Sequence, residues 1–182
     1  MASEAREDLL LRLKDVDEIY EAHKSLTGGG KGKPPRGQGA ALTRAGVVLL
    51  AAALEAFVED LFKEAAVFIL ASNTEEERQD LFKQVIKPFG NASVHKINML
   101  YFNLGIPWVC NDIRWQKCSN ADFKSKLNKL ISVRNDVAHG HPTQLNLQML
   151  MGWKETVKNF SDRFEAKIGR VIFDTTGNQP EW

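Results

Sequence analysis

Two side chains suited to phosphodiester chemistry, Arg134 and His139, stand five positions apart near the end of an expected helix. Histidine exchanges a proton near neutral pH, so it can take the proton of a ribose 2′-hydroxyl or give one to the leaving oxygen. A guanidinium can bind the phosphate and stabilise the charge that develops on its oxygens. Asn135 lies one turn before His139 on the same helix face and could orient the imidazole or bond a phosphate oxygen. These three residues are the candidate catalytic groups for cutting RNA without a metal ion.

The position of Arg134 on its helix allows a second interpretation. The apolar residues before it recur at helical spacing and place Arg134 on the same stripe: Phe123, Leu127, Leu130 and Ile131. A guanidinium facing a core is costly unless it is paired or lines a functional cleft. Arg134 could therefore be the buried ion-pair partner of Glu55 in an interaction module, with His139 capping the helix. An Arg-x4-His spacing also arises by chance and does not separate the two interpretations.

A catalytic site in a single chain faces two difficulties. One histidine cannot easily be acid and base at once, and Arg134 and His139 point about 140° apart around a helix of 3.6 residues per turn. Both difficulties ease if two copies of the helix meet across a two-fold axis, because one cleft then holds two histidines and two arginines. We therefore expect a homodimer. His141 is a less specific candidate for the second titrating group.

The bulk composition is that of one soluble domain. The chain has 182 residues, of which 43% are hydrophobic and 26% charged, and a net charge of +1 gives no argument for wholesale nucleic-acid binding. The charge is unevenly distributed: positions 95–134 hold seven Lys or Arg against two Asp. This basic segment contains Lys124, a candidate RNA contact, and two tryptophans, Trp108 and Trp115, that could stack on bases but are more often core residues.

Other patterns limit the location and the cofactors. Two cysteines, Cys110 and Cys118, are too few for a disulfide framework, so we expect a cytoplasmic protein. Together with His95 they match no standard zinc spacing, and no metal or cofactor is expected. The apolar run Ala45–Val58 is shorter than the ~20 residues that cross a bilayer. It is expected to form a buried core helix, with no membrane contact.

The chain is expected to be an all-α bundle of four or more helices. The predicted helices are Glu4–Leu26, Leu42–Ala71, Thr74–Lys87, Ser93–Leu104, Ala121–His139 and, after Pro142, a last one to Arg170. A short strand is possible at Arg170–Phe173, and Ile106–Ser119 is expected to be irregular. Residues 1–174 then form one domain, and 175–182 a frayed C-terminal tail.

Residues 27–40, rich in glycine and proline, are expected to form a flexible loop. Pro34 and Pro35 stand where a phosphate-binding loop would need Ser or Thr at the start of a helix, so nucleotide binding is not expected there. The loop could be an inert connector. It could also be an arm whose Lys31, Lys33 and Arg36 contact RNA phosphates.

The Arg134–His139 motif, with Asn135 directly after the arginine, resembles the hallmark of the HEPN superfamily. The alanine-rich segment Arg44–Leu61, Leu104–Ile106 and the final Ala-His-Gly are similar to its RiboL-PSP-type or MAE-28990-like branches. The resemblance covers roughly Leu42–Ile168. It implies a helical bundle, a dimer with the motif at the interface, and often a metal-independent endoribonuclease that serves as a toxin or antiviral effector.

On this resemblance Arg134 and His139 are the catalytic pair, and Asn135 or Asp136 is the polar accessory residue. An antitoxin or another protein is a possible partner. Some toxins of the superfamily carry, two residues after the motif histidine, a tyrosine that a partner nucleotidyltransferase modifies. His141 occupies that position here. Other members keep the fold and only bind RNA, nucleotides or proteins, so the resemblance supports the fold more strongly than the activity.

Overall fold

The computed structural model describes residues 2–28 and 39–182. Six helices form in these two ranges: α1 (Glu4–Leu26), α2 (Ala40–Ile69), α3 (Glu75–Val85), α4 (Val94–Phe102), α5 (Asn120–Ala138) and α6 (Leu147–Thr176). Within them, the one β-type pairing is an isolated bridge between Trp115 and Cys118. The prediction of an all-α bundle is confirmed. Lys31, Lys33 and Arg36 lie outside the described residues.

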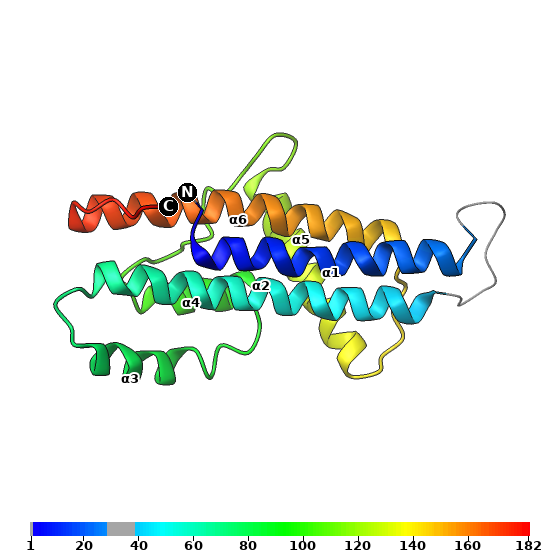
Figure 1. Cartoon of the computed structure of the whole chain (residues 1–182), viewed down its shortest axis with the longest axis horizontal. Coiled ribbons are helices and arrows are strands. Elements are labelled where there is room, and N and C mark those ends of the chain that lie inside the picture. The colour runs from blue at the N-terminus through cyan, green and yellow to red at the C-terminus, as the bar shows by residue number, and fades with distance from the viewer. Residues whose placement is uncertain (1, 29–38) are drawn as a thin grey trace.

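The long helices α1, α2 and α6 run side by side, and α5 crosses behind them (Figure 1). α2 packs against α1, α5 and α6 and also meets the short helices α3 and α4. An aromatic cluster joins three of these helices in the core. Phe123 of α5 stacks on Phe160 of α6 with 5.1 Å between ring centroids, and Phe57 of α2 meets the edge of the same ring at 6.3 Å. Paired rings of this kind fix the relative orientation of the helices that carry them.

Small residues let the helices approach α2 closely. A Cβ atom built on Gly46 would lie 2.5 Å from a methyl carbon of Leu150 in α6 and 3.2 Å from one of Ile19 in α1. Contacts below 3 Å require the neighbour to shift, so a larger residue at position 46 would displace the buried Leu150 side chain at this three-helix junction. The glycine and the alanines of α2 therefore let it lie in the centre of the bundle.

α2 is longer and more apolar than the run Ala45–Val58 suggests. By length and composition alone its 30 residues could cross a membrane, and its most apolar 18-residue window has a mean hydropathy of 1.8. In the bundle α2 is the central core helix, and residues such as Leu54, Phe57 and Leu61 are at most 1% exposed. Half of the apolar window nevertheless lies on the surface of the single chain.

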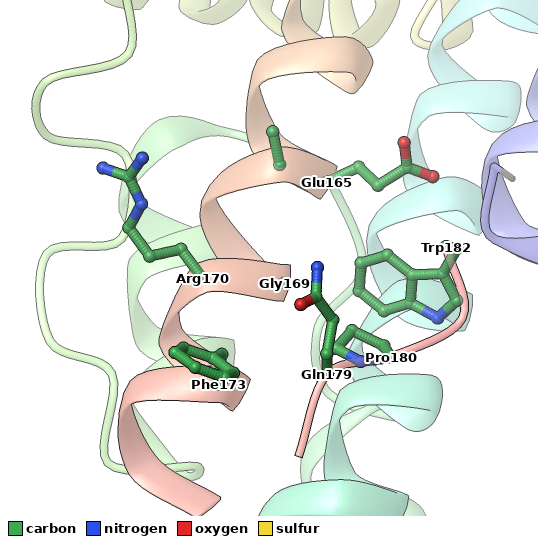
Figure 2. A pocket seen from close by; sticks show the side chains of 8 residues that line it. Glu165, Gly169, Arg170, Phe173, Gln179, Pro180 and Trp182 are labelled. Carbon is green, nitrogen blue, oxygen red and sulfur yellow. The ribbon is translucent and has the colours of Figure 1, made fainter. Parts of the chain in front are cut away.

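The C-terminal region differs from the sequence prediction. The possible strand Arg170–Phe173 is helical, because Ile168 and Ile172 continue the buried stripe of α6. α6 runs to Thr176 and ends at Gly177, whose φ of 73° reverses the chain. The expected frayed tail instead packs back on α6: Pro180 is buried, and the Trp182 ring lies over Gly169, which has no side chain to obstruct it (Figure 2).

Candidate functional site

α5, which carries the motif, is fixed at its beginning and along one face. Ser119 and Asp122 form a capping box, in which each side chain accepts a hydrogen bond from the backbone N–H of the other residue. The side chain of Asn120 donates to the carbonyl oxygens of Cys110 and Ile113. The apolar stripe of α5 is buried: Phe123, Leu127, Leu130, Ile131 and Val133. α5 is therefore a rigid support for whatever its last turn presents.

The burial of α5 ends just before the motif. Residues 134–137 are half-buried and residues 138–140 are exposed. Figure 1 shows the last turns of α5, in yellow, standing off the bundle below α2. The prediction that Arg134 faces the core is therefore only partly right, because the helix extends past the core that the earlier part of the stripe covers. The motif is accessible from solvent.

The guanidinium of Arg134 contacts its sequence neighbour. Its Nη1 donates to Oδ1 of Asn135 at 3.2 Å, which orients the amide and the guanidinium together. Arg134 shares no hydrogen bond with His139 in the described structure, in keeping with their separation around the helix. A phosphate bound by Arg134 would therefore meet Asn135 before it met His139 of the same chain.

Glu55 of α2 is the acidic neighbour of Arg134. The carboxyl group is half-buried, and burial raises its pKa, while the positive charge of Arg134 opposes that rise. Within the described residues the two side chains form no ion pair or hydrogen bond. The alternative in which a direct, buried Arg134–Glu55 ion pair locks two helices together is therefore wrong in that form; the two groups attract each other at longer range.

A helix-ending turn folds the chain back over the end of α5. Gly140 adopts φ 72°, a left-handed conformation that glycine takes without steric cost. The backbone N–H of Gly140 donates to the Val137 carbonyl at 3.2 Å, and that of His141 donates to the Asp136 carbonyl at 2.8 Å. This pair of bonds is the Schellman motif. It returns His141 to the turn that carries Asp136 and His139.

Two histidines and a carboxylate gather at this turn. The rings of His139 and His141 lie 6.0 Å apart with a tilt of 35°. Nδ1 of His141 is 3.5 Å from Oδ1 of Asp136, and the two side chains are 65% and 43% exposed. The structure thus joins Asp136, His139 and His141 in one group and Arg134 with Asn135 in an adjacent one. Together they provide a cation, an amide, a carboxylate and two imidazoles at one solvent-exposed helix end.

Lys124 does not belong to this cluster. It precedes Arg134 by ten residues, about 15 Å along a helix that rises 1.5 Å per residue. Its Nζ donates to Oδ1 of Asn111 at 2.6 Å. The sequence prediction placed Lys124 among the RNA contacts, and the structure places it at the opposite end of α5 from the motif.

The exposed stripe of α2 is a feature that the sequence did not indicate. Val48, Ala52 and Glu55 recur at i, i+4 and i+7, so they share one face, which leads to Arg134. Val48 is 36% exposed and Ala52 is also exposed. The run Ala45–Val58 was predicted to form a buried core helix, and its pattern gave no signal that one side of α2 faces solvent, because that side is apolar too.

The cysteines lie away from the motif. Cys110 and Cys118 are free and buried, and burial raises the pKa of the Cys110 thiol to about 12. His95 is exposed on α4. Across the described ranges, no three His, Cys, Asp or Glu side chains converge in a way that could hold a metal ion.

A helical bundle that exposes an Arg-Asn-x3-His motif at one helix end defines a HEPN-type domain, a class of nucleases and other RNA-related modules. The family model RiboL-PSP-HEPN matches residues 7–170, almost the whole chain, and the protein belongs to this family. No curated protein and no solved structure matches the chain. The match selects the first of the two branches that the sequence resembles, and domains of this kind generally bind RNA and form dimers.

Proposed function

We propose that this protein is a metal-independent endoribonuclease. One observation carries the proposal: Arg134, Asn135, His139 and His141 share the exposed end of one rigid helix in a chain of the RiboL-PSP-HEPN family. The cluster holds both groups that the reaction needs, an imidazole for proton transfer and a cation for the phosphate.

Each residue has a definite role in the proposed reaction. A neutral histidine takes the proton of a ribose 2′-hydroxyl, and the 2′-oxygen attacks the adjacent phosphorus. The bond from phosphorus to the 5′-oxygen breaks, and a protonated histidine gives that oxygen its proton. Arg134 binds a non-bridging phosphate oxygen, and Asn135 holds the guanidinium in place. The products are a 2′,3′-cyclic phosphate and a free 5′-hydroxyl.

The second histidine is best supplied by a second copy of the chain. The apolar α2 stripe of Val48 and Ala52 leads to Glu55, beside Arg134, so a symmetric contact along this stripe would bring two motifs close together. His141 is the alternative source within one chain, and its ring is 6.0 Å from that of His139. In either arrangement one imidazole acts as base while the other acts as acid.

The first test is cleavage of bulk transfer and messenger RNA in excess EDTA. We expect the parent protein to cut RNA, and His139→Ala and Arg134→Ala to lose at least about a hundredfold in rate, the usual loss for a positioned catalytic group. His95→Ala, which removes an exposed histidine from α4, is the matched control and should cut as the parent does. Equal cutting by all four folded proteins would exclude the motif, and loss of cutting in EDTA would exclude the metal-independent reaction.

The dimer is tested separately. Ala52→Arg places a long cation in the middle of the α2 stripe, and Ala22→Arg makes the same change at an exposed position of α1. Light scattering after gel filtration should show a dimer for the parent and for Ala22→Arg, and a monomer for Ala52→Arg. Cutting should fall with the dimer. A parent that is a monomer and still cuts RNA would point to His141 as the second group.

A non-catalytic RNA-binding or interaction module is the second candidate function. The lack of a contact between Arg134 and His139 in one chain favours it. This candidate predicts that the folded dimer binds RNA or a protein but leaves RNA intact.

We further propose that the protein acts as a toxin or antiviral effector that an antitoxin or another partner inhibits. Induced expression of the parent protein in bacteria should then arrest growth, and expression of His139→Ala should not.

A further inference from the structure

A cationic groove lies between α6 and the irregular segment that precedes α5. Its volume is about 390 Å³. Four of the side chains that line it are cationic and two are acidic: Arg114, Arg163, Lys167 and Arg170, with Asp112 and Asp174. Positive charge thus predominates in a concave part of a protein whose net charge is only +1.

The arginines of this groove are not used by the fold. Arg163, Lys167 and Arg170 follow each other at i, i+4 and i+7, so they form one row on α6, about 10 Å long. In the described part of the chain, neither these two arginines nor Arg114 forms a hydrogen bond or an ion pair. Arg6 is different: it pairs with Asp162 at 2.6 Å and with Glu165 at 3.4 Å.

The two acidic residues beside this row in the sequence, Asp162 and Glu165, are both engaged by Arg6. Figure 2 shows Arg170 pointing away from Glu165 and Trp182, across α6 to the side of the pale green segment. The Glu165 carboxylate is engaged on the far side, where it accepts a hydrogen bond from the Ser3 N–H at 2.7 Å. Asp174 lines the groove one turn further along α6, but within the described residues it forms no ion pair with Arg170, so the guanidinium is available to a ligand.

Asn111 gives the edge of the groove a fixed structure. Its carbonyl oxygen accepts from Nζ of Lys167 at 2.7 Å, and its side-chain oxygen accepts from Nζ of Lys124 at 2.6 Å. Two ammonium groups are thus held on either side of one residue. The next residue, Asp112, adopts a left-handed φ of 62°, which non-glycine residues seldom do without a surrounding structure that imposes it.

We propose that this groove binds the phosphate backbone of an RNA strand at a site separate from the motif. A guanidinium presents a planar fork that matches a phosphate, and a row of cations along one helix face follows a strand better than it fits a single small anion. That the strand is RNA rests on the proposed function; the binding itself does not depend on cleavage.

The distance to the motif makes the groove an additional contact. Lys124 shares Asn111 with Lys167 and stands about 15 Å along α5 from Arg134. A stacked strand advances about 3.4 Å per nucleotide, so about four nucleotides would span the roughly 15 Å between Lys124 and Arg134. The groove therefore holds a part of the substrate that is not cut, and it favours RNA long enough to reach both sites.

The test measures binding of a fluorescent 20-nucleotide RNA in the His139→Ala background, so that cleavage cannot interfere. Arg163→Gln with Arg170→Gln should weaken binding about tenfold at moderate salt and lower the salt slope of log K by about 1.4, since each single-strand phosphate contact contributes about 0.7. Arg12→Gln with Lys14→Gln, two exposed positions of α1, removes the same charge and should change binding less than twofold.

Replacing Arg163 and Arg170 with lysine keeps the charge and should restore most of the affinity, which separates phosphate binding from damage to α6. Glutamine and control variants that bind RNA equally well would overturn the proposal. Binding is measured without cleavage, so the two proposals can fail separately. If the parent protein does not cut RNA but the glutamine variant still binds RNA more weakly, the ribonuclease proposal is wrong and the groove proposal stands. If the parent protein cuts RNA but the glutamine variant binds RNA as well as the control does, the groove proposal is wrong and the ribonuclease proposal stands.

Discussion

The backbone N–H of His141 donates to the carbonyl oxygen of Asp136 at 2.8 Å, and this bond sets both histidines at one end of α5. The geometry depends on Gly140, which takes a left-handed φ of 72° between them. The motif as written in the sequence ends at His139. In the folded chain the group of motif residues also includes His141, because the turn brings it back beside Asp136.

Gly140→Ala should therefore disturb the site through the backbone alone. A Cβ at this position would meet nothing within 4 Å, so the cost is that of a left-handed alanine, about 1 kcal/mol. For a domain of this size that corresponds to a fall of about 2–4 °C in Tm. The rate of RNA cutting should fall by up to about a hundredfold, because a small displacement of a catalytic group lowers the rate strongly even when the fold is kept. Calorimetry and an RNA-cutting assay measure the two effects.

Gly152→Ala is the matched control. Gly152 lies within α6 with ordinary helical geometry, and an added Cβ there also meets nothing within 4 Å. Alanine should stabilise the helix by about 0.5–1 kcal/mol and leave cutting unchanged. If Gly140→Ala raises Tm as Gly152→Ala does, residue 140 is not held in a left-handed conformation, and this turn does not position the two histidines.

Arg134→Ala should have little effect on stability. Arg134 is half-buried and forms no ion pair in the described structure, and its one side-chain hydrogen bond is to the neighbouring Asn135. Denaturant unfolding should show a loss below about 1 kcal/mol. Breaking a buried ion pair would cost about 3–5 kcal/mol. A loss of that size would show that Arg134 serves the structure.

The helices were predictable because each carries local signals. Three kinds of signal predict helix ends to within two residues of those that form: the Thr74 capping box, the glycines at positions 28 and 140, and the apolar spacing of α5. The prediction failed at Arg170–Phe173, where Val171 and Ile172 favour a strand locally. The helix continues there because Ile168 and Ile172 pack into the core, and the residues that form this part of the core are distant in the sequence.

The site was less predictable than the fold. The sequence grouped Arg134, Asn135 and His139, but how they pair depends on side-chain direction. Arg134 turns to Asn135, and Glu55 stays beyond ion-pair range. The groove on α6 has no sequence signature, because Arg114 and Arg170 are 56 positions apart and meet only when the segment before α5 folds over α6.

Glu55→Gln should alter stability in a pH-dependent way. Burial raises the pKa of the Glu55 carboxyl above its ordinary value, so its ionised form disfavours the fold. The stability that the protonated carboxyl gives is present below the unfolded pKa, about 4.3, and is lost as pH rises through the higher folded pKa. Glutamine mimics the protonated form, so the variant should melt above the parent at pH 7 and equal it near pH 4.

A control separates this effect from the simple loss of one negative charge. Glu76→Gln removes the same charge from the exposed first turn of α3, where an acidic side chain is favourable, so this variant should not melt above the parent at pH 7. A Glu55→Gln variant that melts below the parent at pH 7 would mean that the attraction of Arg134 outweighs the burial of the carboxylate.

Cys110 should resist alkylation in the folded protein. Its side chain is fully buried, and burial raises the thiol pKa to about 12, so at pH 8 only about one molecule in ten thousand carries the reactive thiolate. In a Cys118→Ser variant, iodoacetamide followed by peptide mass spectrometry should show labelling at least about a hundredfold slower than in guanidinium. Rapid labelling under native conditions would mean that the segment before α5 opens. The adjacent Asn111 would then be unable to hold Lys124 and Lys167 at the edge of the groove.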